Sequence, residues 1–212
     1  MLATSCTAAA TTLEDVKEYY DRRAPEYDDW YLGRGLFAGR ERPGWDEEVE
    51  KLTRVVAALP PARTLDVACG TGFLTRHLEG DVVALDQSTQ MLDETARQAP
   101  RAAVVQGDAL ELPFPDTSFD RVFTAHFYGH LEAETRREFV EEAGRVAGEL
   151  VVVDSARAAS EQDEDPQTRV LNDGSEWTVY KRWFTGPALA DELGGGDVLH
   201  DGRWFVAVRV AL

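Results

Sequence analysis

The sequence has few cysteines and no long apolar run. Its 212 residues include two cysteines, Cys6 near the N-terminus and Cys69 in a glycine-rich stretch, so a disulfide framework is not expected. No segment approaches the roughly 18 apolar residues that a membrane-spanning helix needs. Residues 1–11 lack the basic region and the apolar core of a signal peptide. We therefore expect a disordered tail there and a cytoplasmic protein.

Basic residues are also scarce. The 22 Lys and Arg residues face 39 Asp and Glu residues, which gives a formal net charge of −17 at pH 7. Nucleic acids and anionic membranes are polyanions, so neither is expected as a partner. These features favour an enzyme or a binding domain that acts on a small molecule, as a monomer or a homodimer. We predict no metal site.

What the sequence does contain is an alternation of short apolar segments and amphipathic segments. Strands are expected at residues 63–68, 81–86, 102–108, 119–127 and 148–156. Helices are expected at residues 13–32, with a break at Pro25, and at 43–59, 72–79, 88–99 and 133–146. This alternation is typical of βαβ units with right-handed crossovers and a parallel sheet.

The C-terminal part has a different pattern. Residues 160–175 are acidic and turn-rich, residues 186–193 form a short helical pattern, and Asp201-Gly202 lies between two strand-like runs. An Asp-Gly pair in that position predicts a hairpin. The predicted fold class is α/β: a doubly wound, Rossmann-like sheet of seven strands, mostly parallel, with an antiparallel C-terminal hairpin strand and a helical N-terminal cap.

We expect a single domain over residues 12–212. Its parts are the cap helices (12–60), a ligand-binding core (63–154), an insertion (155–184), and a C-terminal helix with the hairpin (185–212).

The segment "LDVACGTGFLT", residues 65–75, contains a turn at the end of the first predicted strand. Ligands of open parallel sheets bind beyond the carboxyl ends of the strands. Gly70 and Gly72 allow a tight turn and a close approach of ligand to backbone, and the start of a following helix offers unpaired N–H groups. Taken alone, a G-x-G sequence is more often only a tight turn.

The next two strand ends carry carboxylates. Asp86 can accept both hydroxyls of a ribose, and Asp108 can meet an adenine amino group. Three successive strand ends therefore carry what a nucleoside needs. A nicotinamide dinucleotide is disfavoured because its fingerprint needs a third small residue where Thr75 stands, and because Asp86 comes early.

These motifs together resemble a known family. "LDVACGTGFLT", "VVALDQSTQML", "VVQGDALELPFPDTSFDRVF" and "HFYGHL" resemble the successive motifs of class I S-adenosylmethionine-dependent methyltransferases. Within these they resemble the small-molecule branch that includes the methyltransferases of ubiquinone and menaquinone biosynthesis. The opening "YYDRRAPEYDDWY" is similar to the cap helix of that branch, so the resemblance covers residues 19–154.

The resemblance implies S-adenosyl-L-methionine as the cofactor and assigns positions to it. The implied cofactor residues are Asp66 and the backbone of Ala68, Cys69, Gly70 and Gly72 for the amino-acid end, Asp86 for the ribose, Gln87, Met91, Asp108 and Ala109 for the adenine, and Tyr20 and His126 to face and close the pocket. Two alternatives stay open: Met91 as ordinary core, and Asp66 as a residue that only organises the loop.

The implied reaction is methyl transfer to a small-molecule acceptor by in-line displacement. Because a sulfonium already makes its methyl electrophilic, the protein mainly aligns the reactants and excludes water. Where a base is needed, His126, Tyr128 and His130 on the predicted loop after the fourth strand are the candidates. Histidine titrates near neutrality and suits this role, although a structural role for His130 is the alternative.

Two further groups of residues have two interpretations each. The aromatic residues of the cap can exclude water or simply pack the cap on the sheet, and packing is favoured for Tyr27 and Trp30. Lys181 and Arg182 in "VYKRWF" can bind an acidic or aromatic acceptor, but pairing with nearby carboxylates is favoured. Those carboxylates are Glu161, Asp163, Glu164 and Asp165.

Two other functions also remain open. One is a catalytically inactive nucleoside-binding module of the same fold, and the other is a nicotinamide-dependent reductase.

Overall fold

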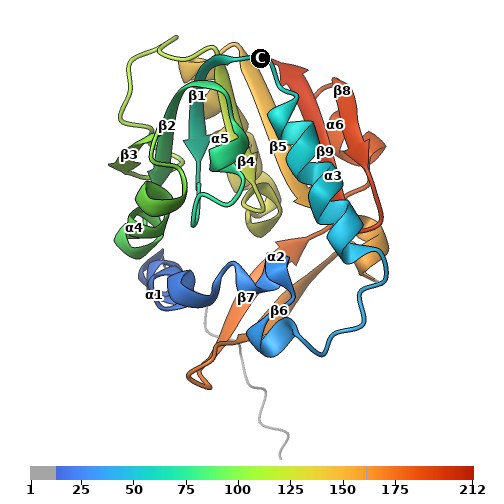
Figure 1. The fold of residues 1–212 in the computed structure, drawn as a ribbon. Helices are drawn as coiled ribbons and strands as arrows, with labels where there is room; N and C mark the ends of the chain where they lie inside the picture. The colour runs from blue at the N-terminus through green and yellow to red at the C-terminus, as the bar shows by residue number, and fades with distance from the viewer. Residues whose placement is uncertain (1–12, 161) are drawn as a thin grey trace, which may run out of the picture.

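A seven-stranded sheet forms the centre of the computed structural model, which describes residues 13–160 and 162–212 (Figure 1). The strand order is β3-β2-β1-β4-β5-β9-β8. The strands are β1 (Ala62–Val67), β2 (Gly80–Asp86), β3 (Ala103–Gln106), β4 (Arg121–Ala125), β5 (Glu149–Ser155), β8 (Asp197–Asp201) and β9 (Phe205–Ala211). The first five pair in parallel, and β9 is antiparallel to both β5 and β8. The predicted fold class is confirmed, whereas the predicted tail at residues 1–11 lies outside the described residues.

Helices cover both faces of this sheet. They are α3 (Trp45–Ala57), α4 (Thr89–Gln98), α5 (Ala133–Val146) and α6 (Gly186–Glu192), whereas α1 (Leu13–Arg23) and α2 (Asp29–Leu32) belong to the cap. Leu52 and Val56 of α3 pack with Val151 and Val153 on one face, while α5 and α6 pack on the other face with Leu150. Because β5 is buried on both faces, it is apolar at four successive positions. Within the described residues, no helix is long and apolar enough to cross a lipid bilayer.

The helix predicted at residues 72–79 is absent from the structure. Only a single 3-10 turn, Thr75–His77, lies between β1 and β2. Gly72 has φ +80 and Leu78 is extended, so neither continues an α-helix. The Thr75 hydroxyl instead donates to Asp66 at 2.6 Å, within the first strand. This polar contact fixes a compact turn where the sequence pattern predicted a helix.

The insertion predicted at residues 155–184, whose first part was expected to be turn-rich, contains a two-stranded sheet. Strands β6 (Glu164–Val170) and β7 (Glu176–Arg182) pair antiparallel. They lie with α1 and α2 beyond one end of the main sheet (Figure 1). Tyr19 of α1 contacts Trp177 of β7, with ring centroids 5.9 Å apart. The hairpin and the cap helices therefore form one structural unit.

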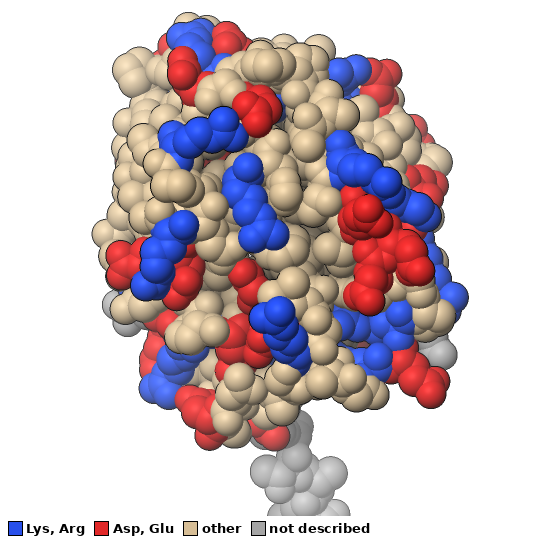
Figure 2. Space-filling model, in the orientation of Figure 1, with Lys and Arg blue, Asp and Glu red and all other residues tan. Residues whose placement is uncertain are grey.

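This unit is fixed to the carboxyl ends of the parallel strands by polar contacts. Ser88, which follows β2 and caps α4, donates from its hydroxyl to Asp21 of α1 at 2.6 Å. Thr71 in the turn after β1 donates to Asp28 at 2.5 Å. The face of the molecule shown in Figure 2 has acidic and basic side chains interspersed. The charge surplus is therefore not gathered into one patch on that face.

Candidate functional site

Two cavities adjoin at the carboxyl ends of the strands. The first, called here the strand-end cavity, has a volume of about 390 Å³ and lies against the ends of β1, β2, β3 and β4. The second, called the cap cavity, has a volume of about 400 Å³ and lies between the cap and the β6–β7 hairpin. Four residues line both cavities: Tyr20, Tyr27, His126 and His130. The two spaces therefore meet at these side chains.

The two cavities carry opposite charges. Among the described residues, the lining of the strand-end cavity contains Asp86, Asp108 and Glu132 but no Lys or Arg. Within the same described part of the chain, the lining of the cap cavity contains no Asp or Glu. Its basic residues are Arg23, Arg40, Arg169 and Lys181. The first cavity therefore suits a cationic ligand and the second an anionic one.

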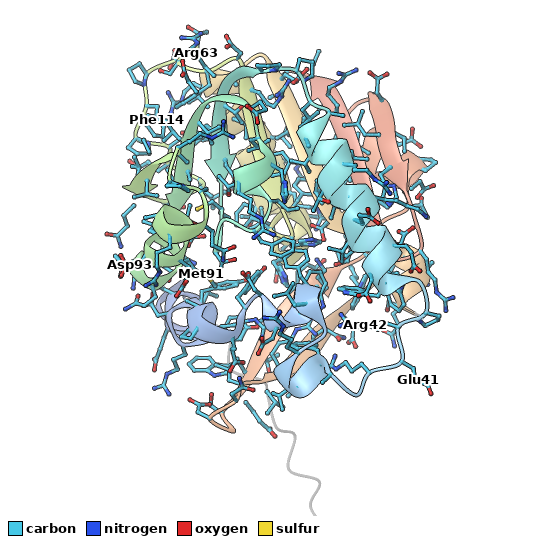
Figure 3. The ribbon with its side chains drawn as sticks, in the orientation of Figure 1. Glu41, Arg42, Arg63, Met91, Asp93 and Phe114 are labelled. Atoms are coloured by element: carbon cyan, nitrogen blue, oxygen red, sulfur yellow. The ribbon has the colours of Figure 1, made fainter. Side chains whose placement is uncertain are left out.

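Asp86 joins the glycine turn to the end of β2. Its two carboxylate oxygens accept the backbone N–H groups of Gly70 at 3.0 Å and of Ser88 at 2.9 Å. Burial raises the pKa of Asp86 to about 6, although these two hydrogen bonds oppose the shift. The side chain is thus fixed in place and lines the strand-end cavity. Gln87, Met91, Asp108 and Ala109 line the same cavity, with Met91 on α4 near α1 (Figure 3).

Asp66 lies beneath the turn and is not part of the cavity lining. The residue is 2% exposed. One of its oxygens accepts from Thr75, and the other, Oδ1, is buried without a hydrogen-bond partner. Burial raises its pKa to about 7, and the charge of Asp86 adds to the shift. Asp66 therefore helps to organise the loop, which was one of its two interpretations. Its Oδ1 remains without a hydrogen-bond donor.

The two glycines of the turn have different surroundings. Gly70, with φ +58, lines the strand-end cavity, and a Cβ added there would meet the Tyr27 ring at 3.9 Å. A Cβ on Gly72 would come within 3.0 Å of the Thr95 Cα on α4. The Cys69 thiol also points to Thr95, 3.5 Å from its hydroxyl. Gly70 thus keeps the cavity open, whereas Gly72 allows α4 to pack closely and does not line the cavity.

Backbone strain is found at the ends of two adjacent strands. Ala68 after β1 and His126 after β4 both have φ +56, a left-handed conformation that is unfavourable for residues other than glycine. Both residues line the strand-end cavity. Strain that the surrounding structure maintains at such a place is typical of functional sites.

His126 and His130 are neutral imidazoles at the boundary of the two cavities. Both ring nitrogens of His126 are buried without hydrogen-bond partners, and burial lowers its pKa to about 4. The Nδ1 of His130 lies 2.6 Å from the Tyr180 carbonyl oxygen, so this nitrogen donates and Nε2 is left as an acceptor. Burial, and then the charge of Lys181, lowers the pKa of His130 to about 3. The expectation that these histidines titrate near neutrality is corrected by their burial.

Comparison with known proteins adds to this geometry. A family model described as "Methyltransferase domain" matches residues 65–149. Residues 65–149 therefore resemble a methyltransferase domain. This match, together with the strand order, shows the resemblance to class I S-adenosylmethionine-dependent methyltransferases that the motifs carry.

Individual proteins resemble the chain beyond this domain. The demethylmenaquinone methyltransferase of Thermotoga maritima is 32% identical over 153 residues, which cover 68% of this chain and 62% of that protein. The enzyme of the same name from Renibacterium salmoninarum is 35% identical over 147 residues, or 66% of this chain and 59% of that protein. The chain therefore spans about three fifths of the length of these relatives.

Two solved structures match almost the whole chain. The DhpI–SAH complex is 27% identical, covers 95% of this chain and 97% of its own, and has a TM-score of 0.71. The DhpI–SAM–HEP complex is 26% identical, covers 96% and 99% of the two chains, and has a TM-score of 0.72. The similarity therefore includes the cap and the C-terminal part, not only the methyltransferase domain.

Tyr128 lies within the methyltransferase domain but lines neither cavity. It is buried beside Phe139 and Phe184, and its hydroxyl lies 3.1 Å from Glu192 on α6. Its position at the end of a strand suggested a catalytic role, but the chain turns its ring into the core. We assign Tyr128 to packing.

Several residues that line the site were not identified from the sequence. Tyr27 and Trp30 were expected only to pack the cap, yet both line the cap cavity and Tyr27 lines both cavities. Tyr20 lies in α1 and Tyr27 follows the 3-10 turn Ala24–Glu26, so the break at Pro25 leaves no common helical face that could have indicated Tyr27. The cationic residues Arg23, Arg40 and Arg169 carry no local motif, since the fold brings them together from three separate segments.

The expected pairing in "VYKRWF" is partly confirmed. Arg182 pairs with Glu164 at 3.3 Å, and also with Glu192 at 3.0 Å. Lys181 instead pairs with Asp154 of β5. Glu161 lies outside the described residues.

Proposed function

We propose that the chain binds S-adenosyl-L-methionine in the strand-end cavity and transfers its methyl group to a small-molecule acceptor held in the cap cavity. The observation that carries this proposal is the meeting of the two cavities at Tyr20, Tyr27, His126 and His130. A group passed between two bound molecules must cross such a boundary. The proposal includes a cytoplasmic location and a monomeric or dimeric state.

The chemistry of the strand-end cavity fits this cofactor. Its sulfonium and ammonium groups are cationic, and the cavity has an acidic lining. The carboxylate of Asp66 lies beneath the turn, outside the lining, and would attract the ammonium group through its charge. Asp86 can accept ribose hydroxyls, while Gln87, Met91, Asp108 and Ala109 can surround the adenine. The backbone of the turn at Ala68, Cys69 and Gly70 would hold the amino-acid end. The two similar solved structures are complexes with SAH and with SAM.

The division of labour in the proposed reaction follows from the residues. The cofactor supplies an electrophilic methyl group, so the protein has to align the acceptor and exclude water. Tyr20 and Tyr27 close the space between the cavities from the cap side. His126 and His130 face it as neutral imidazoles whose pKa values, about 4 and about 3, lie too low for efficient proton removal at neutral pH. Within the proposal they orient the acceptor through ring nitrogens instead of acting as strong bases.

A small-molecule acceptor is also supported by the relatives. The names of the two relatives described above specify demethylmenaquinone as the substrate of those enzymes. Aromatic rings of Tyr19, Trp30 and Phe37 line the cap cavity here. Such rings can hold a planar organic acceptor by stacking.

The first test is calorimetric titration with S-adenosylhomocysteine, with NADH as the control ligand. Micromolar binding of S-adenosylhomocysteine alone is expected. Asp86→Asn should weaken it by about tenfold or more, because hydrogen bonds to a charged acceptor contribute about 1.5–3 kcal/mol. The control variant Asp93→Asn changes an exposed acidic residue on α4 (Figure 3) and should leave the affinity for S-adenosylhomocysteine unchanged. Binding of NADH alone, or of neither ligand, would contradict the proposal.

A further inference from the structure

The cap cavity gathers basic side chains in a chain dominated by acids. The sequence has 39 acidic and 22 basic residues. The basic residues of the lining are Arg23 from α1, Arg40 from the loop after Phe37, Arg169 from β6 and Lys181 from β7. No Asp or Glu of the described segments lines the same cavity. Charged residues taken at random from this sequence would be mostly acidic, so a lining with only basic ones needs an explanation.

One of the four positive charges is already neutralised. The Lys181 ammonium pairs with the buried Asp154 carboxylate. Arg23, Arg40 and Arg169, in contrast, have no carboxylate within 4.0 Å among the residues that the structure describes. Glu26, which lies near Tyr19, accepts the backbone N–H of Asn172 at 2.8 Å. Three guanidinium groups therefore face the cavity without an acidic partner.

The protein compensates these charges only in part. Arg23 is 7% exposed, and its guanidinium lies 5.8 Å from the ring centre of Tyr19 and 5.4 Å from that of Tyr27. Such cation–π contacts stabilise a cation but leave its charge in place. Burial lowers the pKa of Arg169, and the nearby charge of Arg23 adds to the shift. Like charges held together at a half-buried position cost stability unless a ligand neutralises them.

A second feature points to a ligand at the same place. His126 presents two buried ring nitrogens without partners at the boundary of the two cavities. Unsatisfied buried polar atoms of this kind are rare in folded proteins. A polar ligand in the cap cavity would lie between this imidazole and the arginines.

We propose that the cap cavity recognises an acceptor that carries a carboxylate or a phosphate-type group, and that Arg23, Arg40 and Arg169 bind its anionic oxygens. This inference rests on the proposed function, since it names the class of the acceptor. The planar guanidinium group matches both kinds of oxyanion in charge and geometry. The aromatic rings of Tyr19, Trp30 and Phe37 then hold the organic body. A neutral acceptor in this cavity would displace water from three guanidinium groups without supplying a negative charge to compensate for the lost hydration.

The test uses the full chain saturated with S-adenosylhomocysteine and a series of small aromatic probes. Benzoate and phenyl phosphate present the two anionic groups, benzamide is neutral and benzylamine is cationic. Calorimetry should show binding of at least one anion, about tenfold or more tighter than benzamide, and no binding of benzylamine. The stronger of the two anions distinguishes a carboxylate acceptor from a phosphate-type acceptor. Benzamide binding as tightly as both anions would overturn the proposal.

Variants locate the binding within the cavity. Arg169→Gln and Arg40→Gln should each weaken binding of the preferred anion about tenfold, while the affinity for S-adenosylhomocysteine stays the same. Arg40 is exposed, so its variant tests the proposal without disturbing the core. Arg137→Gln makes the same charge change at an exposed position on α5 and should have little effect. An equal loss in Arg137→Gln would show that only the net charge matters, and would refute the subsite.

The two proposals fail separately. Absence of S-adenosylhomocysteine binding would overturn the proposed function, and titration of the anions into the unliganded protein would still test the cavity. Binding of S-adenosylhomocysteine without any preference for the anions would overturn only the acceptor class.

Discussion

The Lys181 ammonium and the Asp154 carboxylate form an ion pair that is almost completely removed from solvent, with side chains 3% and 0% exposed. Asp154 also accepts the backbone N–H of Gly129 at 2.7 Å. Gly129 lies beside His130, so one carboxylate connects β5, β7 and the loop that carries His126 and His130. Burial lowers the pKa of Lys181. Burial alone would raise the pKa of Asp154, but the charge of Lys181, its hydrogen bond and the two neighbouring histidines together hold that pKa below its usual range.

Lys181→Met should destabilise the protein by about 3–5 kcal/mol, because it leaves a buried carboxylate without its partner. Urea denaturation followed by circular dichroism measures this. Arg209→Met is the control, since the Arg209–Asp197 pair is largely exposed and such pairs contribute at most about 1 kcal/mol. The double variant Lys181→Met, Asp154→Asn should be less destabilised than Lys181→Met alone. A double variant that is no more stable would show that charge is not the cause.

Cofactor affinity should depend on pH through Asp66 and Asp86. Their pKa values are raised to about 7 and about 6, above the roughly 4 of an unfolded aspartate. Raised values mean that the contribution of these two carboxyl groups to the stability of the free protein grows as pH falls from about 8 toward 4, because the folded state takes up protons first. The ammonium group and the ribose hydroxyls of S-adenosylhomocysteine interact better with ionised carboxylates, so its affinity should decrease as pH falls through the two pKa values.

Calorimetry at a series of pH values checks this expectation. Asp66→Asn should lower the affinity at about pH 8 and flatten the profile around its own pKa of about 7. Asp93→Asn, an exposed control on α4, should preserve the profile. If the affinity stayed constant between about pH 8 and 5, the ionisation of Asp66 and Asp86 would have no role in cofactor binding.

Elements with a strong local pattern were predicted well from the sequence. The helix expected at residues 133–146 has these bounds in the structure, and the expected parallel strands are present. The buried residues of this helix recur at helical spacing, and the central strands β4 and β5 are runs of successive buried residues. The segment 72–79 also has apolar residues at helical spacing, but Gly72 and the Thr75–Asp66 hydrogen bond hold it as a turn. In β6 burial alternates along the strand, but its half-buried residues are the polar Asp165, Gln167 and Arg169, so no apolar alternation marks the strand in the sequence.

In the candidate site, too, some residues were predictable from the sequence and others were not. Gly70, Asp86 and Asp108 follow successive strands, so topology alone brings them to one edge. The guanidinium groups of Arg23, Arg40 and Arg169 meet only because the hairpin folds against the cap, a long-range contact that no local pattern encodes. The burial of His126 and His130, which sets their pKa values, depends on the same contact.

The two glycines of the turn should respond differently to substitution by alanine. Gly72→Ala should cost about 2–3 kcal/mol, because a left-handed residue gains a Cβ that also meets the Thr95 Cα at 3.0 Å. Gly70→Ala should cost only about 1 kcal/mol, because its Cβ has room. Its Cβ enters the strand-end cavity, however, and should weaken binding of S-adenosylhomocysteine more than Gly72→Ala does. Thermal denaturation measures the loss of stability in each variant, and calorimetry measures its loss of affinity for S-adenosylhomocysteine. If the ratio of these two losses were the same in both variants, the two glycines would not have different roles.

His126 and His130 should remain neutral throughout the physiological pH range. Their pKa values of about 4 and about 3 lie below the value of about 6.5 for an unfolded histidine. The folded protein therefore resists protonation, and the two residues should reduce stability progressively as pH falls from about 6.5 toward 4. Histidine ring resonances measured by NMR between about pH 5 and 9 should show no inflection for these two residues, assigned through His126→Gln and His130→Gln.

The same experiment decides how His130 serves the proposed reaction. A residue that stays neutral with Nδ1 bound to the Tyr180 carbonyl presents a lone pair on Nε2 at every physiological pH, so turnover should show no ionisation from it near neutrality. His130→Asn keeps a polar side chain and should retain more activity than His130→Leu if the role is to orient the acceptor. An inflection near pH 6.5 in both the His130 resonance and the rate would instead identify it as a general base, and would mean that a bound acceptor or a movement of the hairpin exposes the imidazole to water.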